Sequence, residues 1–292
     1  MKFAFPVALL LAAHSALANA LPKRQTPEID DTVILNYALT LEHLENAFYK
    51  EALGKFNAQE FQKAGYPPWV RRRFEEIAKH EATHVETLSS VLKDAAVQPC
   101  QYSFPYTDPK SFVALSQIIE GVGASAYTGA AASITVKDYL AAAASILATE
   151  ARHAAWIAAA VNKQSPYTDA FETPLNFNQV FSLAASFITS CPESNPALPF
   201  TAFPALSFTG KTVAPNSKVR ISYKAEESPE SAPEEMHVAF LHGLNTEYAK
   251  VMNGEVTIPA GLKGTVYALL LSTPAVLDEA TIAGPAVLEF KF

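Results

Sequence analysis

The chain has 292 residues, of which 49% are hydrophobic, so it can build the core of one large domain or two ordinary ones. Charged residues make up 17%, and the formal net charge of -7 is mildly acidic. A basic triplet at 71–73 begins a predicted helix and is typical of a solvated helix face. Nucleic-acid binding is therefore not expected.

Residues 1–20 read as a secretory signal peptide. A lysine follows the initial methionine, residues 3–13 are apolar apart from one proline, and residues 18–20 fit a cleavage site between small residues. A dibasic pair follows, so we interpret 21–29 as a propeptide or linker. The apolar run is too short to span a bilayer, and we find no later transmembrane candidate. We expect the protein to be secreted, either into the extracellular space or to the cell wall.

The first predicted helix begins at an acidic cap near Asp31. Glu42 and Glu45 are three residues apart and share a helix face with Tyr49. Glu42 is the preferred metal ligand because Tyr49 then lies two turns further along, which leaves Glu45 as a supporting residue or replacement ligand. His43 points about 100° away, so we expect it at the surface.

The second long helix is predicted over 69–95. Glu81 and His84 lie within an apolar stripe at helical spacing, on the same helix face. A buried carboxylate and imidazole are costly unless they are paired or bind a cation. This pair therefore indicates a metal site, whereas His80 lies off the stripe and is expected to be exposed or, at best, to support the ligands.

The third helix is predicted to start at Asp108, which can cap it ahead of a proline at the first helical position. Glu120 is its only acidic residue. Gly121 and Gly123 leave room for a neighbouring helix or a small ligand, and tight helix packing is the simpler explanation. Tyr127 lies on the same face as Glu120 and could hydrogen-bond there.

A fourth, alanine-rich helix is predicted over 136–161 and carries Glu150 and His153 at the same three-residue spacing. Glu, Glu-x-x-His, Glu, Glu-x-x-His on four helices is the ligand order of a ferritin-type di-metal site. A third Glu-x-x-His, from Glu234 to His237, lies in a predicted strand. Residues three apart on a strand point to opposite faces, so this occurrence is interpreted as chance.

A fifth helix is predicted over 177–188. Cys100 follows the second helix and Cys191 follows the fifth, each beside a proline. Two cysteines in an exported chain predict one disulfide between them, and two free buried thiols are the alternative.

The composition changes after residue 192, where prolines accumulate and hydrophobic residues begin to alternate. This pattern predicts a small β-sandwich over 196–292, immunoglobulin-like in shape only. A surface metal site at Glu234, Glu235, His237 and His242 is conceivable, but solvated side chains are the preferred interpretation. The predicted strands are 219–223, 237–241, 255–258, 265–271 and 287–292.

Three features together resemble a known family: residues 41–49 (LEHLENAFY), the two helical Glu-x-x-His motifs, and residues 187–192 (FITSCP). They are similar to secreted fungal ferritin-like proteins of the stress-response and late-sexual-development type, which are related to plant desiccation-related proteins. The resemblance covers about 28–195. It implies a mainly α fold, with a four-helix bundle and a fifth helix in 30–195. The implied metal ligands are Glu42, Glu81, His84, Glu120, Glu150 and His153.

The leading hypothesis is a protein that binds two iron or manganese ions, since carboxylates and imidazoles suit both metals. If it is an enzyme, the expected chemistry is ferroxidase-like, catalase-like or oxidase-like, with oxygen or peroxide. No catalytic residue is assigned, and Tyr49, Tyr127 and Glu45 are candidates for a supporting role. The alternative is a non-catalytic structural or stress-protective protein with a self-satisfied Glu–His cluster. A cell-wall or surface partner of the β-domain is a further hypothesis.

Overall fold

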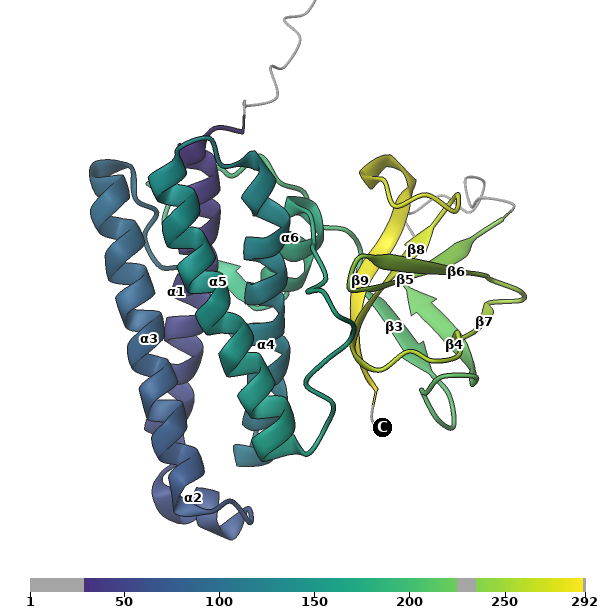
Figure 1. Ribbon diagram of the computed structural model, residues 1–292, viewed down its shortest axis with the longest axis horizontal. Helices are drawn as coiled ribbons and strands as arrows, with labels where there is room; N and C mark the ends of the chain where they lie inside the picture. Colours follow the sequence, from purple (N-terminus) through teal and green to yellow (C-terminus); the bar gives the residue numbers. More distant parts are fainter. Residues whose placement is uncertain (1–28, 225–234, 291–292) are drawn as a thin grey trace, which may run out of the picture.

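A computed structural model describes residues 29–224 and 235–290. The helices lie on one side of the molecule and the β-sheets on the other (Figure 1). The predicted signal peptide, residues 21–28 and Glu234 lie outside the described residues. Within the described ranges, none of the helices combines the length and the hydrophobicity that a bilayer crossing requires.

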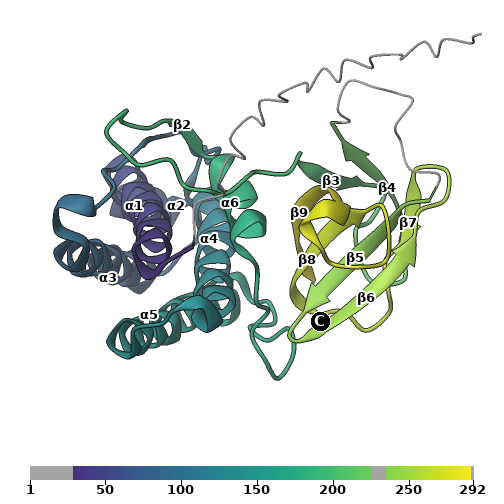
Figure 2. The ribbon, with the colours of Figure 1, turned by 90° about the horizontal axis from the view of Figure 1, so that it is seen from above.

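Four long helices form the helical part, and their order is the predicted one. α1 packs against α3, and α4 packs against α5 (Figure 2). A π-helical segment continues α5, and the short α2 connects α1 to α3. The bounds are α1 Asp31–Lys55, α2 Ala58–Lys63, α3 Pro68–Leu92, α4 Pro109–Ala130, α5 Lys137–Trp156 and the π-helix Ile157–Asn162.

Local sequence explains where these helices begin. The Asp30 carboxylate accepts the Val33 backbone N–H at 2.9 Å, and the Asp108 carboxylate accepts that of Ser111 at 2.8 Å. Each bond satisfies one of the free N–H groups at a helix start. Pro109 stands at the first position of α4, where no N–H is needed.

The fifth helix is shorter than predicted. α6 spans Phe177–Ala185, and β2 (Ile188–Ser190) follows and pairs with β1 (Gln101–Tyr102). Ile188 is therefore in a strand, because pairing with Tyr102 takes its backbone out of the helix. A disulfide joins Cys100 to Cys191 beside this sheet, which confirms the predicted bridge.

The C-terminal part is a pair of antiparallel sheets, with strand orders β3-β4-β7 and β6-β5-β8-β9. Their facing sides share one apolar core, in which Val219 and Val256 of the first sheet meet Phe240 and Val266 of the second. The predicted sandwich is thus present. The strands are β3 Leu206–Thr209, β4 Lys218–Tyr223, β5 His237–His242, β6 Asn245–Lys250, β7 Glu255–Thr257, β8 Gly264–Leu271 and β9 Thr281–Phe290.

Two details of the sandwich differ from the prediction. Strands β3 and β6 were not expected, because their sequences alternate weakly. The last strand begins earlier than the predicted 287–292, because β9 starts at Thr281 and its pairing with β8 continues through a register shift. His237 and His242 stand at opposite ends of β5, so these two histidines do not form the conceivable metal site.

The outer face of the larger sheet packs on the helices. Leu241, Tyr267 and Leu269 belong to the same apolar cluster as Val180 and Ala184 of α6. Ser125 Oγ of α4 donates to Tyr267 Oη at 3.0 Å. The sheets therefore cover the α4/α6 side of the helical part and leave the α3/α5 side uncovered (Figure 2).

Candidate metal centre

The six predicted ligands meet between the two helix pairs. Glu42 comes from α1, Glu120 from α4, and the two Glu-x-x-His pairs from α3 and α5. Three-residue spacing on a helix places Glu81 and His84 on one face, directed across the bundle toward Glu150 and His153. All four glutamates are fully buried.

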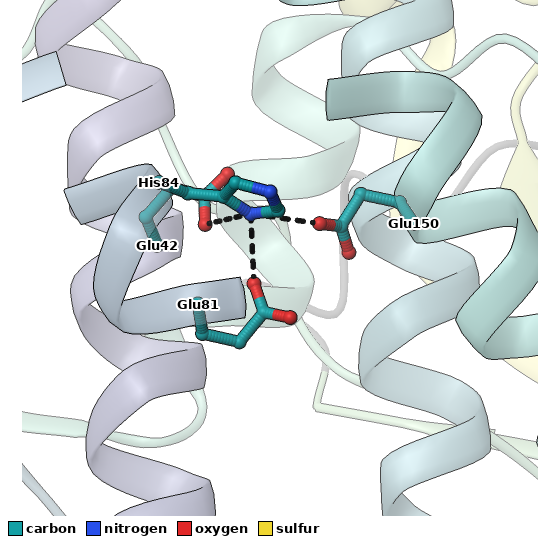
Figure 3. A group of neighbouring side chains, drawn as sticks. All are labelled: Glu42, Glu81, His84 and Glu150. Carbon is teal, nitrogen blue, oxygen red and sulfur yellow. Dashed lines mark hydrogen bonds and ion pairs between the residues drawn. The ribbon is translucent and has the colours of Figure 1, made fainter. Parts of the chain in front are cut away.

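One half of the cluster is centred on His84. Its Nδ1 atom lies 3.2 Å from Glu42 Oε2, 3.1 Å from Glu81 Oε2 and 3.2 Å from Glu150 Oε1. Figure 3 shows this nitrogen between three carboxylates, with Glu150 approaching from the opposite side of the bundle. One ligand atom from each of these four residues lies within 4.8 Å of all the others.

The other half is centred on His153. Its Nδ1 atom lies 2.9 Å from Glu120 Oε2 and 3.3 Å from Glu81 Oε1. Together with Glu150, these residues form a second group within the same 4.8 Å limit. Glu81 and Glu150 belong to both groups, and Glu81 turns one oxygen toward each histidine. The structure therefore places side by side two Glu/His groups that could each hold a metal ion, with two carboxylates in common.

Two tyrosines hold the carboxylates that are not shared. Tyr127 Oη of α4 donates to Glu42 Oε1 at 2.6 Å, and Tyr49 Oη of α1 donates to Glu120 Oε1. Each tyrosine lies seven residues after the ligand glutamate of its own helix. Its hydroxyl, however, donates to the ligand glutamate of the other helix. The two hydroxyls fix one oxygen of each carboxylate and leave the second to face the histidines.

The pKa shifts of the buried glutamates indicate that too little positive charge surrounds their carboxyl groups. Burial raises the pKa of Glu42 to about 7, and burial with repulsion from neighbouring glutamates raises the pKa of Glu150 and Glu45 well above the ordinary value. Burial alone would raise the pKa of Glu81, but contacts with His153 and His84 lower it. Bringing several acids into a low-dielectric interior is costly without a cation.

The histidines respond in the opposite direction. Burial lowers the pKa of His84, but contacts with Glu150, Glu42 and Glu81 outweigh it and raise the pKa to about 12. For His153, burial is likewise outweighed by Glu120 and Glu81, and the pKa rises to about 9. The imidazoles thus serve as counter-charges for the glutamates.

The histidines do not satisfy the whole cluster. Within the described residues, Glu81 Oε1 and both oxygens of Glu150 are buried without a hydrogen bond. A histidine nitrogen lies within ion-pair distance of Glu81 Oε1 and of Glu150 Oε1. Buried polar atoms without partners are rare and costly. Two divalent ions would balance four ionised carboxylates in charge and engage these oxygens. The oxygen and nitrogen donor set suits iron and manganese, so the residues fit the group that the motif predicts.

Glu45 is buried but belongs to neither group, in line with the preference for Glu42 as the ligand. His80 is exposed, as predicted, and it also contacts a candidate ligand. Its ring is stacked on that of His153, and its Nδ1 atom lies 2.9 Å from His153 Nε2. His80 adjoins Glu81 on α3, yet only the approach of α5 gives it this contact.

The prediction for His43 was wrong. The side chain is buried, and its Nε2 atom lies 3.1 Å from the Val97 carbonyl oxygen. The segment after α3 folds back over α1 and covers this face of the helix, which the periodicity of α1 alone does not reveal.

Comparison with known proteins agrees with this geometry. Residues 30–163 match a family described as "Ferritin-like domain". The chain is 28% identical over 182 residues to Protein rds1 of Schizosaccharomyces pombe (strain 972 / ATCC 24843). That match covers 62% of this chain and 45% of the relative, so the chain spans less than half of that protein's length. The helical part is thus similar in sequence to this family, and the chain is similar to part of a fungal protein.

Proposed function

We propose that the ferritin-like domain holds two iron or manganese ions between α1, α3, α4 and α5, in a secreted protein. The observation that carries this proposal lies on the two glutamates shared by both groups. Three of their oxygens are buried and have no hydrogen bond in the described part of the chain, and for two of these a histidine nitrogen at 3.2 or 3.3 Å is an ion-pair neighbour. One ion would take Glu42 and His84, the other Glu120 and His153. Glu81 and Glu150 would serve both.

The bound metals would supply electron exchange with oxygen or peroxide. The protein's own residues keep the site ready for them. Tyr127 and Tyr49 hold the unshared carboxylates in place through hydrogen bonds. Burial excludes bulk water from all four glutamates. His80 contacts His153 Nε2, which leaves Nδ1 of that ring to face the carboxylates.

Metal content tests the proposal. The mature protein, purified from its host without chelator, should contain two iron or manganese ions per chain by elemental analysis, and the chelated protein should take up two on addition of ferrous or manganous ions. The double variant Glu81→Ala, His84→Ala should bind none. Glu86→Ala, an exposed acid on the same helix, should keep both. Full occupancy in the double variant, or no uptake by the wild type, would refute the assignment.

The alternative is a stress-protective protein that keeps the fold without turnover. The contacts between each histidine and the surrounding carboxylates favour it, because they partly neutralise the cluster without metal. Consumption of oxygen or peroxide by the metal-loaded protein would decide for catalysis, and its absence would decide for the alternative.

A further inference from the structure

An apolar cavity lies beside the metal centre, on the side where α6 covers the bundle. It has a volume of about 90 Å³ and lies between α1, α4 and α6. Its walls are almost entirely apolar, and Glu45 and Ser186 supply the polar side chains. Ser186, at the end of α6, is exposed and marks the outer side of the cavity, whereas Glu45 is buried. The main apolar residues are Leu41, Leu44, Ile119, Val122, Leu183 and Phe187.

The inner wall of this cavity lies next to a shared carboxylate of the metal centre. Gly123 lines the cavity, and a Cβ atom added there would lie 2.9 Å from Glu45 Oε1 and 3.2 Å from Glu150 Oε2. Any side chain at this position would therefore press against both carboxylates. The absence of a side chain at Gly123 therefore leaves room beside Glu45 and Glu150 at the inner wall of the cavity, and the two oxygens of Glu150 have no hydrogen bond within the described residues.

The size and lining of the cavity select its occupant. One water needs about 10–15 Å³ of such volume, and an apolar cavity of about 150 Å³ binds benzene, so this cavity suits a small molecule. A metal ion or hydrogen peroxide would lose strong interactions with water on entering apolar walls. Dioxygen is small and apolar and loses almost none.

We propose that the α1/α4/α6 cavity is a dioxygen-binding site that supplies the metal centre past Gly123. The inference rests on the proposed function and deepens it, because it makes dioxygen rather than peroxide the co-substrate. A smaller apolar cavity of about 40 Å³ is lined by the first half of α1 and by Tyr127, and it shares Leu41 with the α1/α4/α6 cavity. None of the candidate ligands lines either cavity, but the α1/α4/α6 cavity is lined by Gly123, where an added Cβ atom would lie 3.2 Å from Glu150 Oε2.

Xenon, an apolar probe of similar size, tests the cavity independently of the metal. Crystals of the chelated protein under xenon pressure should show xenon between Leu183 and Gly123. Leu183→Phe should fill the cavity and remove that xenon, whereas Leu244→Phe, the same change at an exposed turn, should leave it. An empty wild-type cavity under xenon would overturn the proposal, and this measurement needs no variant to fold.

Kinetics then connect the cavity to the centre. With two metals bound, Leu183→Phe should raise KM for dioxygen about tenfold with little change in kcat, because only binding is impaired. Metal content and any reaction with peroxide should stay at wild-type values. An unchanged KM for dioxygen, or faster turnover with peroxide than with dioxygen in the wild type, would refute the proposal. Metal analysis of the same samples separates either failure from failure of the di-metal assignment.

Discussion

Replacing Glu150 by glutamine should stabilise the metal-free protein. Burial and repulsion from Glu81 and Glu120 raise the pKa of Glu150 far above its ordinary value of 4.5. Between these two pKa values the folded protein binds a proton that the unfolded chain releases, so wild-type stability falls as pH rises. The loss is about 1.4 kcal/mol per pH unit above 4.5, or about 2 kcal/mol at pH 6. Glutamine has no proton to bind and avoids this loss.

Urea unfolding of chelated protein at several pH values measures the effect. Glu150→Gln and wild type should be equally stable near pH 4.5, and the variant should gain about 2 kcal/mol by pH 6, or about 4–8 °C in Tm. Glu86→Gln, at an exposed position on α3, should track the wild type at every pH.

Adding manganous ions should make the wild type more stable than Glu150→Gln. A ligand at 100 times its Kd stabilises a folded protein by about 2.7 kcal/mol per site. The wild type should gain this at both sites, whereas the variant loses a carboxylate shared by both and should gain much less. If Glu150→Gln is the less stable protein without metal at pH 6, or if manganese stabilises both proteins equally, Glu150 is not a buried acid that awaits a cation.

Three further predictions concern other contacts. His80→Ala should weaken one of two metal-binding steps about 10–100-fold in calorimetric titration, and equal affinities would show that the contact with His153 is incidental. Burial raises the pKa of Glu289 to about 7, so the free energy of unfolding of the wild type should fall by about 3 kcal/mol between pH 4.5 and 7. Urea unfolding of Glu289→Gln should not show this fall, and parallel pH profiles of the two proteins would contradict the prediction. Reducing the Cys100–Cys191 bridge, which spans 91 residues, should cost about 4.6 kcal/mol of stability, and an unchanged urea midpoint after reduction would exclude that role.

Much of the helical part and its candidate site could be predicted from sequence, because the evidence for them is local. The Glu-x-x-His spacing places Glu81 with His84 and Glu150 with His153 on any regular helix. Asp108 before a proline marks a helix start wherever the helix is later packed. The end of α6 was predicted less well, because Ile188 leaves the helix to pair with a strand more than eighty residues earlier in the chain.

Contacts between elements far apart in sequence depended on the tertiary structure. Three features arise only when the helix pairs meet. Both groups share Glu81 and Glu150, the tyrosines of α1 and α4 donate to each other's glutamates, and His80 contacts His153. The same holds for the packing of the larger sheet on α4 and α6, which a sandwich pattern does not specify. Sequence periodicity determined which residues share a face of each helix or strand. Long-range packing decided which faces meet, because burial of apolar surface has no direction of its own.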